Sequence, residues 1–259
     1  MKLYVIPHLE EIDKWISLSK EHNLGFEYNE FFNPNVLDNE HILNELITKY
    51  KDLNRNADTL HGVFFDINLV SNDQKIKEIS LERVISSLRI AEKLKCKGVV
   101  FHTNYQTWIK SESYKNMWIK ESVKVYKKLL DMFPNLDIYV ENMFDDDPMM
   151  LSHLAEQLKD EKHFGVCLDV AHAFISNTDL DIWFNELSPY IKHIHLNDND
   201  KNADLHLALG DGCLNIEYVF EMINKLDDVT VLLEINKYED VVKSLNVIKK
   251  VQLWNLLKI

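Results

Sequence analysis

Eight short apolar runs recur along the chain, and segments long enough to form helices separate them. β-Branched and aromatic residues are frequent in these runs, as is typical of buried strands. Parallel strands need crossover connections, and eight strand–helix units close naturally into a barrel. The pattern therefore predicts an α/β fold, a (β/α)8 barrel. Its strands are expected at KLYVI (2–6), LGFEY (24–28), TLHGVF (59–64), GVVFH (98–102), DIYVE (137–141), FGVCLD (164–169), IKHIHL (191–196) and VTVLLE (229–234).

The intervening segments differ in how clearly their sequence predicts a helix. Residues 33–58 are polar and poorly periodic, and residues 210–213 are expected to form a loop. No repeat, low-complexity tract or Pro/Gly-rich linker interrupts the alternation, so residues 1–259 are expected to form a single domain. The clearest helix face, with a period of about 3.6 residues, comprises Ile79, Val84, Ile85, Leu88, Ala91 and Leu94.

Composition and charge narrow the class of protein. A chain of 259 residues with 46% hydrophobic content can bury a large core. No apolar run approaches membrane-spanning length and the first residues do not resemble a signal peptide, so we expect a cytoplasmic protein with no membrane partner. The net charge of −13 disfavours nucleic acid as a partner without excluding it, because bound cations can reverse the local field. Cys96, Cys167 and Cys213 are widely spaced and are interpreted as packing residues.

Metal-competent side chains stand at or near the carboxyl end of six successive predicted strands. In a parallel barrel these ends meet on one face, where the loops build the site. Side-chain alternation places Val140 and Leu233 on the opposite face from Glu141 and Glu234, so the two carboxylates are expected to point into the barrel mouth. The set is His61, His102, Glu141, Asp169, His195 and Glu234.

Three further candidate ligands lie close to these strand ends. His172 follows Asp169 in LDVAH, and Asp204 and His206 form a D-L-H sequence in the loop after residues 191–196. Ionised carboxylates are costly to bury alone, and a divalent metal ion is the simplest compensation. The nine residues together therefore predict a metal site on one face of the barrel.

The remaining titratable residues near these segments are expected to serve structure rather than chemistry. His193 is interpreted as a core histidine or as a support for a ligand, and the run DDDP at 145–148 is expected to cap the helix that follows it. Surface positions are expected for His22, His41, His153 and His163, and a solvated turn for Asp198 and Asp200.

The chain resembles the xylose isomerase-like TIM barrels. This superfamily includes sugar and sugar-phosphate isomerases and epimerases, and the AP endonuclease family 2 enzymes of the endonuclease IV type. The motifs that carry the resemblance occur in the family's order across residues 61–236, which is most of the chain. They are HGVFFDINL, VVFHTN, IYVEN, GVCLDVAH, HIHLND, DLHLALGDGCLNIE and VLLEIN.

The resemblance implies roles for the candidate residues. Glu141 and Glu234 correspond to the catalytic acid and base of the isomerase branch, and His172, His102 and His61 to residues that contact substrate. The four-ligand metal site of that branch corresponds to Glu141, Asp169, His195 and Glu234. In the endonuclease branch, adding His61, His102, His172, Asp204 and His206 gives the nine ligands of three zinc ions. A divalent cofactor is therefore expected, zinc or manganese, with one to three ions.

Two activities stay open, with a small-molecule sugar or sugar phosphate as the expected substrate of the favoured one. That one is a metal-dependent isomerase or epimerase. The alternative is an endonuclease IV-like phosphodiesterase acting at abasic DNA sites, but ENMFDDDP replaces that branch's glycine-rich segment, and Leu205 replaces its arginine. A barrel that binds metal or sugar without turnover is a third reading, disfavoured because no motif is broken.

Two further parts of the sequence, a pair of aromatic residues and the C-terminal tail, each have two expected roles. Tyr105 and Trp108 either wall the pocket or pack against the following helix. The tail VQLWNLLKI (251–259) either packs locally on the helical ring or contacts a second copy in a homodimer.

Overall fold

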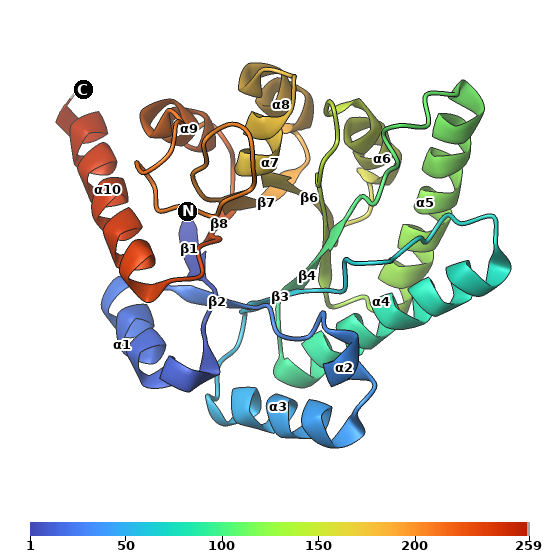
Figure 1. The fold of residues 1–259 in the computed structure, drawn as a ribbon, viewed down its shortest axis with the longest axis horizontal. Helices are drawn as coiled ribbons and strands as arrows, with labels where there is room; N and C mark the ends of the chain where they lie inside the picture. Colours follow the sequence, from blue (N-terminus) through green and yellow to red (C-terminus); the bar gives the residue numbers. More distant parts are fainter. Residues whose placement is uncertain (258–259) are drawn as a thin grey trace.

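Eight parallel strands form a closed barrel at the centre of the molecule, in the order β1 to β8 along the chain (Figure 1). The computed structural model describes residues 1–257, with side chains up to Val251. Each strand pairs with its sequence neighbours, and β1 pairs with β8 to close the sheet. The strands are β1 (Lys2–Val5), β2 (Gly25–Tyr28), β3 (Thr59–His61), β4 (Gly98–His102), β5 (Asp137–Glu141), β6 (Phe164–Asp169), β7 (Ile191–Leu196) and β8 (Thr230–Leu233).

Helices surround the strands as an outer ring (Figure 1). Helix N-termini are capped by side chains with the expected chemistry: the Asp73 carboxylate accepts from the Lys75 and Ile76 amides, and Ser111 accepts from the Tyr114 amide. The helices are α1 (Ile12–His22), α2 (Pro34–Leu37), α3 (Glu40–Asp52), α4 (Gln74–Leu94), α5 (Glu112–Met132), α6 (Met149–Leu158), α7 (Val170–Ile175), α8 (Leu180–Leu187), α9 (Ile216–Ile223) and α10 (Tyr238–Leu257), with a 3-10 turn η1 (Leu9–Glu11).

Successive side chains of each strand point alternately outward, toward the helices, and inward, into the barrel, so two separate apolar clusters form. Ile138 and Val140 of β5 belong to the large core between the strands and the helices. Tyr139, between them, packs with Val100 and Cys167 in a separate cluster. Glu141 has the same parity as Tyr139, so it faces the barrel interior, as the sequence pattern predicts.

The barrel prediction is confirmed, and the differences are local. Strand β3 ends at His61 rather than at 64, and Glu234 follows β8 directly. Residues 33–58 contain two helices, α2 and α3, whose few buried residues, such as Ile47 and Tyr50, explain the weak periodicity of this segment. On α4, Val84, Leu88, Ala91 and Leu94 are buried as expected and Ile85 is half-buried, but Ile79 is 48% exposed. Its neighbour Ser80 occupies the buried face instead, where its hydroxyl accepts from the Asn68 amide.

The first and last helices meet and complete the ring. Trp15 of α1 packs edge-on against Tyr238 at the start of α10, with ring centroids 5.3 Å apart. Val251 is buried in the main core, but the side chains of residues 252–259, on which the expectation for the tail depends, lie outside the described residues. No helix in the described part of the chain combines the length and the apolarity needed to cross a membrane.

Candidate metal centre

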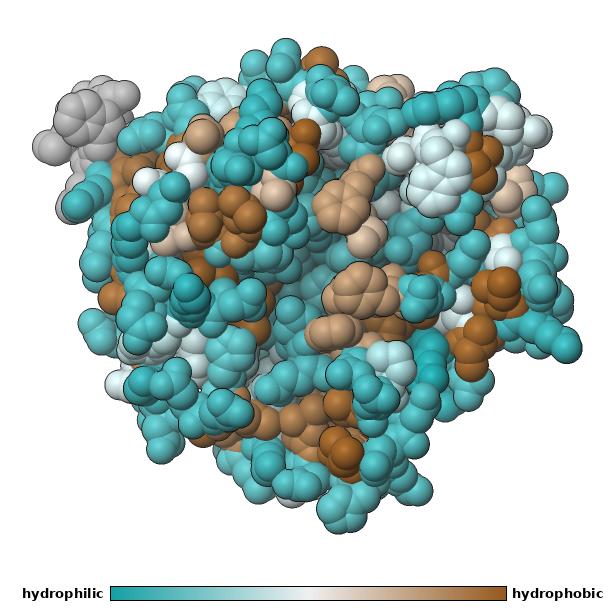
Figure 2. Space-filling view, in the orientation of Figure 1, coloured by the Kyte–Doolittle hydropathy of each residue, from teal (hydrophilic) through white to brown (hydrophobic). Residues whose placement is uncertain are grey.

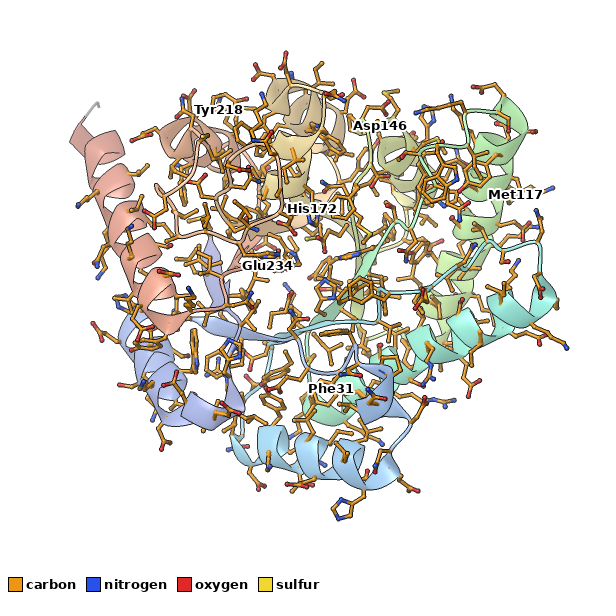
Figure 3. All side chains as sticks on the ribbon, in the orientation of Figure 1. Phe31, Met117, Asp146, His172, Tyr218 and Glu234 are labelled. Atoms are coloured by element: carbon orange, nitrogen blue, oxygen red, sulfur yellow. The ribbon has the colours of Figure 1, made fainter. Side chains whose placement is uncertain are left out.

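The carboxyl ends of β3 to β8 bring the predicted ligands to one end of the barrel. The strand register places His102 directly beside Glu141 and Asp169 directly beside His195. His61, which ends β3, and Glu234, which follows β8, complete the circle. In Figure 3 the labelled His172 and Glu234 lie near the centre of the ring of helices. The structure therefore gathers residues from six strands that are far apart in sequence.

Glu141 lies at the centre of this cluster and is fully buried. Its Oε2 atom is 3.5 Å from His61 Nε2, 3.5 Å from His102 Nε2 and 3.3 Å from His195 Nδ1. Burial acts to raise the pKa of Glu141, but His195 and His102 outweigh it and hold the pKa well below its usual range. The other carboxylate oxygen, Oε1, is 3.6 Å from His172 Nδ1, so Glu141 is a carboxylate shared by four histidines.

A second group of candidate ligands shares Glu141 and His195 with the first. Ligand atoms of Glu141, Asp169 and His195 all lie within 4.8 Å of one another, and Glu234 Oε2 is 3.5 Å from His195 Nδ1. Burial raises the pKa of Asp169 to about 8. The Asn142 side chain fixes this strand end, because it donates to the Asp169 carbonyl and accepts from the Asp169 amide.

Asp204 forms the third group with His172 and His206. Its Oδ2 atom is 3.2 Å from His172 Nε2 and 3.0 Å from His206 Nε2. The opposite ring nitrogens lie against backbone carbonyls, His172 Nδ1 3.0 Å from Asn142 O and His206 Nδ1 2.8 Å from Glu234 O. The two carbonyls accept from Nδ1–H, and the Asp204 carboxylate accepts from Nε2–H of both rings. Burial lowers the pKa of the two imidazoles, but the neighbouring carboxylates outweigh it, raising the pKa of His206 to about 9 and that of His172 well above its usual value. A metal ion bound at Nε2 would take the place of the proton there.

The donor atoms of these groups fit a divalent metal. Both carboxylate oxygens of Glu141, Asp169 Oδ2, His195 Nδ1 and Glu234 Oε2 are buried and make no hydrogen bond with any described residue. Proteins rarely leave buried polar atoms without a partner. Imidazole and carboxylate ligands suit zinc or manganese, and three histidine-containing groups exceed the coordination shell of one ion. The side chains can therefore hold at least one divalent cation.

One cysteine lies close to this site. Cys167 is within ligand distance of His193 and His195, and in the metal-free protein burial raises the pKa of its thiol well above the usual value. Cys167 and Cys96 are buried packing residues as expected. Cys213 is exposed, which corrects its assignment as a packing residue, because it lies in a surface loop rather than on a strand.

Glu27 is a member of the site that the sequence reasoning missed. This β2 residue is fully buried, with Oε1 3.0 Å from His195 Nε2 and Oε2 3.2 Å from His193 Nε2. Its Oε2 also accepts from the Thr59 hydroxyl. Glu27 thus holds His195 so that Nδ1 faces Glu141 and Glu234. The available signal was an acidic residue inside the apolar run LGFEY.

His193 is a core histidine, as one of its two readings predicted. It is fully buried, stacks on Tyr139 with ring centroids 5.4 Å apart, and places Nδ1 2.6 Å from Thr230 Oγ1. The other histidines differ from the expectation in part. His41 and His153 are exposed, whereas His22 and His163 are half-buried, and His163 pairs with Asp137 at 2.7 Å.

Asp198 organises the loop that carries Asp204 and His206. Its buried carboxylate accepts from the backbone amides of Gly210, Gly212 and Leu214, which corrects the expectation of a solvated turn. A Cβ atom at Gly212 would lie 2.3 Å from the Asn199 carbonyl, so only glycine fits there. Asp200, by contrast, is exposed and forms the expected turn with Asn202 and Ala203.

The expectation for DDDP holds only for one of its acidic residues. Asp147 accepts from the Met149 amide at the start of α6. Asp145 is instead buried, and its carboxylate accepts from Thr103 and from the Met143 amide. Trp108 is 73% exposed, which excludes core packing for it, while Tyr105 stacks on Tyr114 of α5.

A cavity of about 270 Å³, here called the metal cavity, opens over the ligands. His61, His102, His172, Asp204, His206 and Glu234 line it. Apolar walls are added by Phe64, Phe65 and Phe144, and no lysine or arginine of the described residues lines it. Phe65 and Phe144 are more than half exposed at its edge. Figure 2 shows a hollow near the centre of this face with apolar side chains beside it.

Comparison with known proteins places the chain in a family. It is 29% identical over 252 residues to an uncharacterized protein of Methanocaldococcus jannaschii, covering 95% of this chain and 84% of that protein. It is 26% identical over 213 residues to a probable endonuclease 4 of Campylobacter concisus, covering 72% of this chain and 74% of that protein.

A solved structure has the same fold. The structure of a D-tagatose 3-epimerase-like protein matches with a TM-score of 0.78 at 20% identity, covering 100% of this chain and 99% of that one. The family model described as xylose isomerase-like TIM barrel matches residues 18–251. The resemblance inferred from the motifs is thereby confirmed: the chain belongs to the xylose isomerase-like TIM barrel family.

Proposed function

We propose that the protein is a metal-dependent isomerase or epimerase of a small, unphosphorylated sugar. The observation that carries the proposal is the position of two carboxylates, Glu141 and Glu234, whose Oε2 atoms lie 3.3 and 3.5 Å from His195 Nδ1. Glu234 lines a cavity of only about 270 Å³, and the buried Glu141 contacts the lining residues His61 and His102. This volume is at the lower end for ligand sites and suits a single small molecule.

The carboxylates supply the acid and base. Burial opposes ionisation of Glu234, but His195 and His206 outweigh it and lower its pKa, so the carboxylate is ionised at neutral pH. Glu234 lines the cavity and can accept a proton from a substrate carbon beside a carbonyl group. A divalent ion held by Glu141, Asp169, His195 and Glu234 would polarise that carbonyl and acidify the C–H bond. Glu141 is the second carboxylate for proton return.

The cavity lining favours an uncharged substrate. Phosphate groups are usually bound by lysine, arginine or a helix N-terminus, and the lining contains neither cationic residue among the described positions. The faces of Phe64, Phe65 and Phe144 can pack against the C–H groups of a sugar ring or chain. His61, His102 and His172 line the same cavity and can bind its hydroxyl groups.

A second candidate, phosphodiester hydrolysis, is favoured by one observation. Glu141 is shared between two ligand groups, and Asp204 joins His172 and His206 in a third. Nine ligands exceed the needs of one ion, and clustered ions are typical of hydrolases. The net charge of −13 and the lack of cationic lining residues oppose binding to DNA.

The double variant Asp204→Ala/His206→Ala separates the two functions. The isomerase reading predicts that it retains the metal held by Glu141 and solvent-deuterium exchange into an unphosphorylated ketose. The hydrolase reading predicts loss of one ion and a rate loss on the order of 10²–10³-fold. Asp200→Ala, in the exposed turn of the same loop, is the matched control.

The assays are deuterium incorporation into a panel of pentoses, hexoses and their phosphates, cleavage of an abasic-site oligonucleotide, and a count of bound metal. Exchange confined to free sugars supports the proposal. Exchange confined to sugar phosphates contradicts the substrate class. Oligonucleotide cleavage by the wild type, without sugar exchange and with loss of zinc in the double variant, would establish the hydrolase instead.

A further inference from the structure

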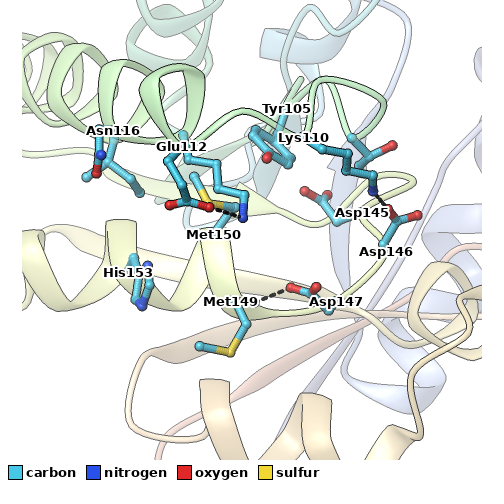
Figure 4. Close-up of a pocket in the computed structure, with 13 residues that line it drawn as sticks. Tyr105, Lys110, Glu112, Asn116, Asp145, Asp146, Asp147, Met149, Met150 and His153 are labelled. Carbon is cyan, nitrogen blue, oxygen red and sulfur yellow. Dashed lines mark hydrogen bonds and ion pairs between the residues drawn. The ribbon is translucent and has the colours of Figure 1, made fainter.

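A second cavity, of about 490 Å³, lies beside the metal cavity between the first turns of α5 and α6 (Figure 4). The loop from β5 to α6 separates the two. Met143 and Phe144 line the metal cavity, whereas Asp145, Asp146 and Asp147 line the second cavity. The second cavity contains none of the nine ligand residues, so it is a separate site.

Asp145 is the feature of this cavity that calls for a ligand. Its side chain is 5% exposed, and its Oδ2 atom accepts from Thr103 Oγ1 at 2.8 Å and from the Met143 amide at 2.9 Å. Its Oδ1 atom is buried and makes no hydrogen bond with any described residue. Burial raises the pKa of this carboxyl to about 6, because the hydrogen bonds from Thr103 and Met143 and the charge of His172 offset only part of the cost of desolvation.

The cations around the cavity are already paired with other acids. Lys110 Nζ is 2.6 Å from Asp146, and Lys115 Nζ is 2.7 Å from Glu112, as the dashed lines in Figure 4 indicate. Asp145 and Asp147 have no ion pair with the described residues. The lining therefore carries an excess of negative charge, and its most buried carboxylate is the one that is uncompensated.

The residues that line the second cavity favour an organic cation over a metal ion as its ligand. No carboxylate of this cavity belongs to a group of described acids, histidines or cysteines close enough to share an ion. Among the other lining residues, Thr107, Asn116 and His153 are polar, and the apolar or aromatic ones are Tyr105, Ile119, Met149 and Met150. Aromatic and thioether surfaces pack well against methylene groups next to a cation.

We propose that the second cavity binds a small organic ammonium compound, with the ammonium group against Asp145 and the hydrocarbon part against the methionines and Tyr105. An ammonium group donates to the free Oδ1 atom and neutralises the carboxylate, while the chain covers apolar wall. The ligand class is an alkylamine or diamine of a few carbons.

The experiment is calorimetric titration of the full-length, metal-loaded protein with 1,4-diaminobutane. Salt at about 150 mM screens attraction to the net negative surface beyond about 8 Å. We expect one binding site, no binding of the neutral 1,4-butanediol, and about a tenfold or larger loss of affinity in Asp145→Asn, as for one charge-assisted hydrogen bond. Asp200→Asn, in an exposed turn of another loop, should bind like the wild type.

Three results overturn the proposal: no diamine binding by the wild type, unchanged affinity in Asp145→Asn, or equal binding of the diol. Binding of Ca²⁺ that depends on Asp145, without diamine binding, would assign a metal site instead. Circular dichroism checks the fold of each variant. If Asp145→Asn is unfolded, Asp147→Asn decides, because Asp147 is exposed and its loss should weaken diamine binding several-fold.

Discussion

Replacing Glu27 by glutamine tests whether a buried residue outside the ligand set controls the metal centre. The Glu27 carboxylate has three polar neighbours: it accepts a hydrogen bond from the Thr59 hydroxyl at 2.7 Å, and it lies within ion-pair distance of His195 Nε2 at 3.0 Å and His193 Nε2 at 3.2 Å. Glutamine has nearly the same shape but only one acceptor oxygen. At least one of these neighbours must therefore turn away or change its protonation.

The expected loss of metal affinity follows from the charged partner that His195 loses in Glu27→Gln. Glu27 carries a full negative charge, because the pKa-raising effect of burial is outweighed by His195 and His193. A charged acceptor on Nε2 makes Nδ1 a stronger ligand and fixes the ring orientation. Loss of such an outer partner typically lowers metal affinity about 10–100-fold, which is about 1.4–2.7 kcal/mol.

The assay is competition for Zn²⁺ between the protein and a chromophoric chelator, for wild type, Glu27→Gln and the control Glu217→Gln. Glu217 is exposed on α9, so its variant should bind metal like the wild type. Thermal unfolding of the metal-free proteins separates weaker binding from weaker folding. Wild-type affinity in Glu27→Gln would refute the idea that this carboxylate positions His195.

Three further predictions concern the second carboxylate, the buried acid and the loop. Glu234→Gln should lose turnover while keeping its fold, checked by deuterium exchange and circular dichroism, because this strand-end side chain is not a packing residue. Asp145→Asn should be more stable than the wild type above pH 7, by at most about 3 kcal/mol, and nearly equal near pH 4. The folded-state pKa of about 6 is raised from 3.8, so ionisation of Asp145 costs stability that builds up between these two pH values and is fully present above pH 6; denaturant titration at pH 4 and above pH 7 decides. Gly212→Ala should displace the loop and lower bound zinc, measured by metal analysis, because its Cβ would meet the Asn199 carbonyl; unchanged zinc content would contradict this.

Local sequence patterns determined the architecture. Strand-length apolar runs and helix-length spacers are properties of neighbouring residues, and eight of them leave few folds other than a barrel. The same locality explains why the candidate ligands could be predicted to share one end of the barrel. Glu141 and Asp169 stand at strand ends, where the parity of side chains fixes the face they occupy.

Only the tertiary structure decided the roles of acidic residues whose partners are distant in sequence. From the sequence Glu27 is an ordinary strand residue, but in the folded barrel it contacts His193 and His195 of β7. Asp198 reads as a turn residue until the loop folds back to give it three backbone amides. Asp145 reads as a helix cap until Thr103 from the neighbouring loop covers it. In each case the acid is buried, and a buried carboxylate needs hydrogen-bond donors or positive charge to replace water. Which groups supply them depends on the segments that the fold places beside it.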